Sequence, residues 1–266
     1  MAKRLPIFQN SKLQKVFEKQ GFVVIPDFIS PDTIKYLDEF FDKNHTNLPD
    51  EGFVSDSYSG DFKLKELLSN EILKIFTPSY EGVFQNYQAF GGSFLYKMPS
   101  HNSELVMHQD WTIVDEEKYV AINCWVPLCD TSLENGTLMV LPGGHYDALP
   151  VYRAPTLDFF FTGNEDIVRS KLFPLEVKAG TAVILNQSLV HFSPANKSGK
   201  IRKAITAGVK SKGAPMLFCY KSPENKDELE LYEMDENFLI RFDDFFADIM
   251  KKPVHGNFFK KTDYKL

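Results

Sequence analysis

The sequence predicts a mainly β fold with flanking helices: a double-stranded β-helix (jelly roll, cupin-like) core buttressed by N-terminal α-helices. The first third of the chain carries amphipathic helical patterns. From about residue 85 the pattern changes to short β-branched or aromatic runs separated by Gly, Pro, Asn and Asp. Many short strands with turn signals between them are typical of a sandwich or jelly roll. No composition shift or internal repeat divides the chain, so we expect residues 1–266 to form one domain.

The clearest helix signal is SPDTIKYLDEFFDKN, residues 30–44. Ser30 suits the N-cap, Pro31 suits the first helical position, and the apolar residues fall on one face. His45 follows the helix, where an imidazole can cap the last carbonyls. We expect further elements in this part of the chain: a short buried strand in 21–29 and helices over 13–19 and 61–76, the last of these as one helix or two.

The strand series is expected in seven runs, residues 84–90, 92–98, 120–128, 136–143, 175–186, 189–196 and 203–211. Residues 146–175 interrupt this series with few periodic signals, and such a long connection is often a lid or binding loop. Its three phenylalanines at 159–161 could form an apolar pocket wall or anchor the loop in the core, and we favour the core. Arg153 or Arg169 could clamp an anion. The C-terminal segment 245–266, which ends in the tail 253–266, is expected to pack by its aromatic residues and then fray.

Composition narrows the classes of partner. The net charge of −6 comes from interspersed acids and bases without a long basic block, so nucleic acid is not expected to bind. Three cysteines without a CxxC pair predict neither a disulfide framework nor a thiolate zinc site, which favours a cytoplasmic location. No export signal is evident and no run approaches ~18 apolar residues, so no membrane association is expected. The sequence does not indicate the oligomeric state.

The segment MHQDW, residues 107–111, contains a candidate metal pair. In a β-strand, His108 and Asp110 would emerge on the same face, although a lone HxD is more often a solvated polar pair. His191, in a strand-like run far downstream, is the third candidate, although alone it could be a core or edge histidine. Two imidazoles and one carboxylate can bind one face of an octahedral metal and leave the opposite positions open, as in non-haem iron oxygenases.

Arg202 lies eleven residues beyond His191, with Ser193 between them. A guanidinium pairs bidentately with a carboxylate, and a hydroxyl can donate to the same oxygens, so Arg202 and Ser193 could hold the far carboxylate of a keto-acid co-substrate. A hairpin over 197–205 is expected to return the arginine beside His191 on an adjacent antiparallel strand. The alternative is a solvated arginine among the lysines of that hairpin.

Three segments carry a family resemblance: HQD (108–110), WVPLCDTSLENGTLMVLPGGH (125–145) and HFS (191–193) with Arg202. Together they resemble the phytanoyl-CoA dioxygenase (PhyH-like) family of Fe(II)/2-oxoglutarate-dependent oxygenases. The likeness covers roughly residues 90–210, and residues 21–34 are similar to the opening strand and helix of that family. Residues 146–175 and those after 212 match no pattern of the family.

The resemblance implies roles for individual residues. His108, Asp110 and His191 would bind Fe(II), while Arg202 and Ser193 would bind the distal carboxylate of 2-oxoglutarate. Gln109 and Trp125 match positions that contact the co-substrate. Asn123 shares a strand face with Trp125, so it is expected in the same site, and Cys124 then points away from it.

The resemblance also implies a reaction. The chain would consume O2 and 2-oxoglutarate, release succinate and CO2, and hydroxylate an unactivated C–H bond. Asp110 favours hydroxylation over halogenation, while desaturation and cyclisation stay open. The net negative charge favours a small substrate, a free amino acid or a biosynthetic intermediate, over a CoA thioester. The alternatives are a catalytically inactive jelly-roll binding protein and a cupin-like metalloenzyme that does not use 2-oxoglutarate.

Overall fold

The computed structural model describes residues 5–144, 152–221, 228–253 and 258–265, with the backbone alone for residue 228 and for the last range. Residues 146–151 of the expected lid therefore lie outside the described residues, as do residues 254–257 and 266 of the expected C-terminal tail.

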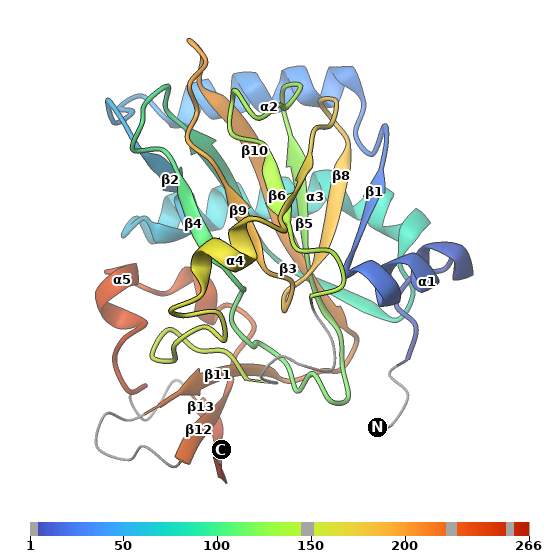
Figure 1. The fold of residues 1–266 in the computed structure, drawn as a ribbon, viewed down its shortest axis with the longest axis vertical. Coiled ribbons are helices and arrows are strands. Elements are labelled where there is room, and N and C mark those ends of the chain that lie inside the picture. Colours follow the sequence, from blue (N-terminus) through green and yellow to red (C-terminus); the bar gives the residue numbers. More distant parts are fainter. Residues whose placement is uncertain (1–4, 145–151, 222–227, 254–257, 266) are drawn as a thin grey trace.

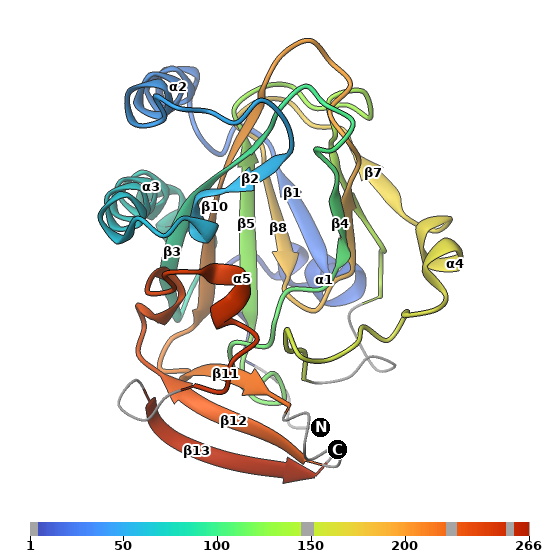
Figure 2. The same cartoon turned by 90° about the vertical axis from the view of Figure 1, so that its left-hand side faces the viewer.

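Two antiparallel sheets face each other and form the centre of the molecule, which confirms the predicted fold class (Figures 1 and 2). The six-stranded sheet has the order β1 (Phe22–Ile25), β8 (Ala182–Asn186), β5 (Ala121–Pro127), β10 (Arg202–Ser211), β3 (Tyr87–Lys97) and β2 (Phe53–Ser55). The four-stranded sheet has the order β4 (Leu105–His108), β9 (His191–Ser193), β6 (Leu138–Val140) and β7 (Phe173–Leu175).

Helices cover the outer face of the six-stranded sheet, where α2 (Pro31–Asn44) and α3 (Phe62–Val83) lie side by side (Figure 2). α1 (Ser11–Gln20) precedes β1. The Ser30 hydroxyl accepts a hydrogen bond from the Thr33 amide at 3.2 Å, which confirms the N-cap of α2. At the other end of α2, Nδ1 of His45 lies 2.9 Å from the Phe41 carbonyl oxygen, as expected of a capping imidazole. α3 is one helix that continues through Pro78. No helix in the described part of the chain is long and apolar enough to cross a membrane.

Strand β5 separates two hydrophobic cores because its side chains alternate between its faces. Cys124 packs in the core between the sheet and the helices, whereas Trp125 packs between the two sheets with Leu138, Val140 and Val183. Cys124 thus points away from the inter-sheet cavity, as predicted, and burial raises the pKa of its thiol to about 12, so this thiol is structural and not reactive.

The C-terminal region was not predicted correctly. β11 (Met216–Tyr220), β12 (Glu228–Met234) and β13 (Phe258–Lys265) form a third antiparallel sheet, so residues 258–265 are paired and do not fray. The reason is that β13 hydrogen-bonds along an edge of β12 that would otherwise stay open. The chain between β12 and β13 contains the 3-10 turn η2 (Phe238–Ile240) and the short helix α5 (Phe245–Asp248). Two other short elements had no sequence signal, namely η1 (Asp56–Tyr58) and α4 (Glu165–Arg169).

A buried lysine joins the two central sheets. Lys97, at the end of β3, is fully buried, and its ammonium donates to the carbonyls of Ser103, Ser193 and Pro194. Three acceptors match the three hydrogens of an ammonium group. Lys97 therefore fixes the end of β9 against β3.

Candidate metal centre

The metal cluster is formed by one histidine at the end of each of two paired strands and by an aspartate that follows the first of these strands. His108 ends β4, His191 begins β9, and the two histidines are opposite each other in an antiparallel pair. Asp110 Oδ1 lies 3.7 Å from His108 Nε2 and 3.9 Å from His191 Nε2. One ligand atom from each residue lies within 4.8 Å of the others, so the three can share one ion, as the sequence predicted. Asp110 itself lies just outside β4, so strand geometry alone does not align it with His108.

Backbone carbonyls fix the tautomer of both imidazoles. His108 Nδ1 lies 2.8 Å from the Val106 oxygen, and His191 Nδ1 lies 3.0 Å from the Leu189 oxygen. A carbonyl only accepts, so Nδ1 carries the hydrogen and each Nε2 offers a lone pair. Burial, together with the nearby His191, lowers the pKa of His108 to about 4, which keeps this ring neutral, as a metal ligand must be.

Asn123 orients the carboxylate of Asp110. Its amide nitrogen donates to Asp110 Oδ2 at 3.3 Å, and the Thr206 hydroxyl donates to the Asn123 amide oxygen. This chain of hydrogen bonds connects the six-stranded sheet to the carboxylate and leaves Oδ1 beside the two imidazoles. Asn123 thus lies in the site, as the sequence predicted, and its amide hydrogen-bonds to the candidate metal ligand Asp110.

Arg153 holds the backbone of the same residue. Its Nε donates to the Asp110 carbonyl oxygen at 2.7 Å, and its guanidinium forms a buried ion pair with Glu116. The suggestion that Arg153 clamps a substrate anion is therefore wrong, because its charge is already neutralised. Arg169, the other suggested clamp, is partly exposed, stacks on the Phe192 ring and lies 3.7 Å from Glu104.

The Asn123 contact predicts a measurable effect on metal binding. An Asn123→Ala variant is expected to bind Mn(II) about 10- to 100-fold more weakly, because Asp110 loses the partner that orients it. Isothermal titration calorimetry measures the affinity, and circular dichroism confirms the fold. Thr206→Val, which removes only the more distant bond, should have a smaller effect. Unchanged Mn(II) affinity in Asn123→Ala would show that the amide does not position the carboxylate.

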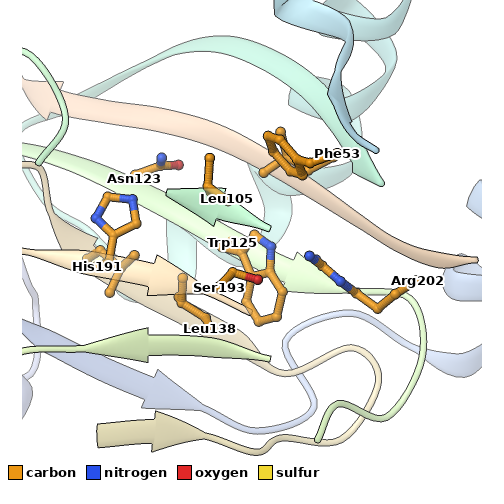
Figure 3. Close-up of a pocket in the computed structure, with 10 residues that line it drawn as sticks. Phe53, Leu105, Asn123, Trp125, Leu138, His191, Ser193 and Arg202 are labelled. Atoms are coloured by element: carbon orange, nitrogen blue, oxygen red, sulfur yellow. The ribbon is translucent and has the colours of Figure 1, made fainter. Parts of the chain in front are cut away.

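A cavity of about 40 Å³ lies between the two sheets and reaches from His191 to Arg202 (Figure 3). Four leucines and Trp125 form half of its wall, and Arg202 and His191 lie toward opposite ends of it. Arg202 is 3% exposed as a residue, and its guanidinium carbon lies 5.6 Å from the Trp125 ring centre.

Arg202 is the one member of this cavity whose charge lacks a partner. Its Nε is buried without a hydrogen bond, and the guanidinium forms no ion pair with any residue that the structure describes. Burial lowers its pKa to about 10, so it stays charged at neutral pH. A buried charge without a counter-ion is costly. The cavity is therefore suited to an anion that lies between Arg202 and the metal cluster.

Arg202 reaches the cavity by a different route from the predicted one. β9 pairs with β4 and β6 in one sheet, whereas β10 pairs with β3 and β5 in the other. The expected pairing of β9 with β10 is wrong because the connecting residues, 194–201, cross from one sheet to the other (Figure 2). Arg202 and His191 meet across the interior and not along a hairpin.

Ser193 lines the same cavity, but its hydroxyl donates to the Gly136 carbonyl at 2.8 Å. A hydroxyl has one hydrogen. The expected contact with a co-substrate carboxylate would require this hydrogen to leave Gly136.

A second, larger pocket of about 420 Å³ adjoins the metal cluster and is lined by His108, Asp110 and His191. Gln109 lies here, and not in the smaller cavity with Trp125. Its amide nitrogen donates to the Ser188 carbonyl at 2.6 Å, which leaves its oxygen buried without a partner. The side-chain oxygen of Gln187, in the same pocket, is also unpaired. Both oxygens can accept a hydrogen bond from a bound molecule.

The outer wall of this pocket was largely missed by sequence reasoning. It is formed by Tyr58, Trp111 and Phe159 and by five apolar residues of the C-terminal region: Leu239, Ile240, Phe245, Phe246 and Ile249. Of the three consecutive phenylalanines, Phe161 is buried in a core cluster, while Phe159 stacks on it and lines the pocket, so both suggested roles occur. No motif marks residues 238–249, and only their apolar side chains hint at a packed role.

Two imidazoles and a carboxylate converge on one point inside a double-stranded β-helix, and an unpaired arginine lies in the adjoining cavity. This is the defining arrangement of the iron- and 2-oxoglutarate-dependent oxygenases. Residues 17–204 match the model of the phytanoyl-CoA dioxygenase (PhyH) family. The chain belongs to this family.

Relatives and solved structures agree with this assignment. The chain is 35% identical over 120 residues to phytanoyl-CoA dioxygenase domain-containing protein 1 of Danio rerio, a match of 42% of this chain that spans only 41% of that relative. It is 26% identical to phytanoyl-CoA dioxygenase of Arabidopsis thaliana over 249 residues, which cover 73% of this chain and 86% of the relative. The epimerase SnoN, solved with Fe3+, alpha ketoglutarate and nogalamycin RO, has a TM-score of 0.54 at 19% identity, covering 77% of this chain and 86% of SnoN. At that identity the likeness concerns the fold.

Proposed function

We propose that this chain is an Fe(II)- and 2-oxoglutarate-dependent dioxygenase that hydroxylates a C–H bond of a small molecule and releases succinate and CO2, with residues 1–266 as one domain. His108, Asp110 and His191 would hold the iron. The observation that carries the proposal is the buried, unpaired Arg202 at one end of a cavity whose other end reaches His191. A dicarboxylate can place one end at the metal and the other at this guanidinium, which a metalloenzyme without 2-oxoglutarate would not need.

Bound iron would supply oxygen activation coupled to decarboxylation of the keto acid. The protein residues supply placement. The leucine wall of the smaller cavity excludes water, so the attraction between Arg202 and a carboxylate acts in a medium of low dielectric constant. Asn123 and Arg153 fix the side chain and the backbone of Asp110, so the ligand cluster is held before the iron binds.

The larger pocket supports a small-molecule substrate. Its volume of about 420 Å³ lies within the range of small-molecule sites, roughly 300–1,000 Å³. SnoN, which has the same fold, was solved with a small molecule bound. The apolar and aromatic outer wall favours a biosynthetic intermediate with an apolar body over a small polar amino acid.

The test is anaerobic assembly with Fe(II) and 2-oxoglutarate, followed by admission of O2 in the presence of a metabolite collection. We expect iron-dependent succinate formation that one class of compound accelerates. Metal binding without any 2-oxoglutarate binding or succinate would indicate the cupin-like alternative. A protein that binds neither metal nor 2-oxoglutarate would indicate the inactive binding protein.

A further inference from the structure

A buried ammonium group lies in the wall of the larger pocket, apart from the metal cluster. Lys65, in the first turns of α3, is 2% exposed and lines the pocket. Its Nζ donates one hydrogen bond, to the Phe242 carbonyl at 2.6 Å. An ammonium has three hydrogens. No described residue takes the other two, so they are available to a molecule in the pocket.

The carboxylates around Lys65 do not neutralise it directly. Burial lowers the pKa of Lys65, and the charges of Asp243, Asp248 and Asp61 oppose that shift. Asp61 caps α3 by accepting from the Leu64 amide, and Asp248 pairs with Lys251 at 2.8 Å. None of these carboxylates forms an ion pair with Lys65 among the described residues, so the two remaining hydrogens of its ammonium can bind an acidic group in the pocket.

Aromatic side chains form part of the same pocket wall as this ammonium. Phe245 stacks on Trp111 with ring centres 5.5 Å apart and contacts Tyr58 at 4.4 Å between ring centres. It forms the wall together with four other apolar residues of the segment 238–249, and the Lys65 bond to Phe242 attaches the same segment to α3. A ligand here meets one ammonium group and the apolar side chains of residues 238–249, while Asp56 and Asp110 line other parts of the pocket.

We propose that Lys65 anchors the substrate, which is an amphipathic anion: a carboxylate or similar acidic group bound by Lys65, and an apolar body packed against residues 238–249. This inference rests on the proposed function in one respect, which is that the bound anion is the molecule that the enzyme oxidises. Binding of the anion itself requires neither iron nor 2-oxoglutarate. Residues 238–249, which form the wall for the apolar body, lie beyond the part of the chain that matches the family model.

The test uses a matched pair of probes, 4-phenylbutyrate and 4-phenylbutyramide, which differ in charge at nearly constant shape. Isothermal titration calorimetry is performed on the full chain without iron or 2-oxoglutarate. We expect the acid to bind at least about 10-fold more tightly than the amide, because only the acid forms a charge-assisted hydrogen bond with the ammonium. The Lys65→Met variant should lose this preference while its affinity for the amide stays within about 2-fold of the unmodified protein.

Three controls keep the result specific. Lys63→Met removes an exposed lysine from the same turn of α3 and should retain the preference. Arg202→Met should also retain it, because the acid is not expected to enter the smaller cavity. Circular dichroism and thermal melts check the fold of each variant, and the comparison of acid with amide on the unmodified protein does not depend on any variant.

Several outcomes would overturn the proposal. These are equal affinity for acid and amide, no binding of either, equal weakening of both probes in Lys65→Met, or a preference that disappears in Arg202→Met. Equal weakening would mean that Lys65 only attaches the segment 238–249 to α3. Because no turnover is measured, failure here leaves the proposed oxygenase reaction intact, and absence of succinate formation would not change the comparison of probes.

Discussion

An Asp110→Ala variant is expected to bind Mn(II) more weakly by at least about 100-fold and to form no succinate above background. Changes to groups that merely orient a ligand cost about 10- to 100-fold in metal affinity, so removal of the ligand should exceed that. The variant also loses the only carboxylate in the cluster of three, which leaves two neutral imidazoles to hold a divalent ion. Calorimetric titration with Mn(II) measures the affinity, and the succinate assay measures turnover.

Glu117→Ala is the matched control, because it removes an exposed carboxylate seven residues further along the chain and changes the net charge equally. It should bind Mn(II) as the unmodified protein does. Comparable metal affinity in Asp110→Ala and Glu117→Ala would refute the assignment of Asp110 as a ligand. Loss of affinity in both would show that net charge, and not a specific ligand, governs binding.

The ligands of the metal cluster could be predicted from the HQD and HFS segments and the family that they resemble. The antiparallel pairing of β4 with β9, which brings His108 opposite His191, was not predicted, because no strand was expected over residues 105–108. The position of Asp110 was predicted correctly, but for an incomplete reason. Alternation along a strand suggested the shared face, whereas Asp110 lies beyond β4 and is oriented by Asn123 and Arg153. Such contacts between distant segments leave no periodic trace in the sequence.

The wall of the larger pocket could not be predicted for a related reason. Phe245 lines the pocket because Trp111 and Tyr58 contact its ring and because Lys65 donates a hydrogen bond to the nearby Phe242 carbonyl. Each of these contacts joins residues more than 100 positions apart. Local patterns report burial but not the partner, so the aromatic residues of 238–249 indicated packing without indicating an active-site wall.

An Arg202→Met variant is expected to raise the KM for 2-oxoglutarate at least about 30-fold, the usual loss when one partner of a buried charge pair is truncated. The same variant should make the ligand-free protein more stable by about 1–4 kcal/mol, because an apolar side chain replaces a buried charge that has no partner. The succinate assay measures the KM, and urea unfolding, with and without 2-oxoglutarate, measures the stability. The co-substrate should stabilise the unmodified protein and leave Arg202→Met unchanged, because a ligand stabilises only the state that binds it.

Lys97 is the internal comparison, since it lies directly opposite Arg202 in the register of β3 and β10 and is also buried. Burial and the nearby Arg202 lower the pKa of Lys97 to about 6, but three carbonyl acceptors match the three hydrogens of the protonated form. Its three hydrogens are all accepted by carbonyls, so Lys97→Met should destabilise the protein by about 3 kcal/mol or more as those carbonyls lose their donor. If Lys97→Met lowers the free energy of unfolding and Arg202→Met raises it, Lys97 is a structural group that holds the sheets together and Arg202 is a binding group for an anion. If Arg202→Met also destabilises the ligand-free protein, Arg202 is a structural group, and the carboxylate site loses the observation on which it depends.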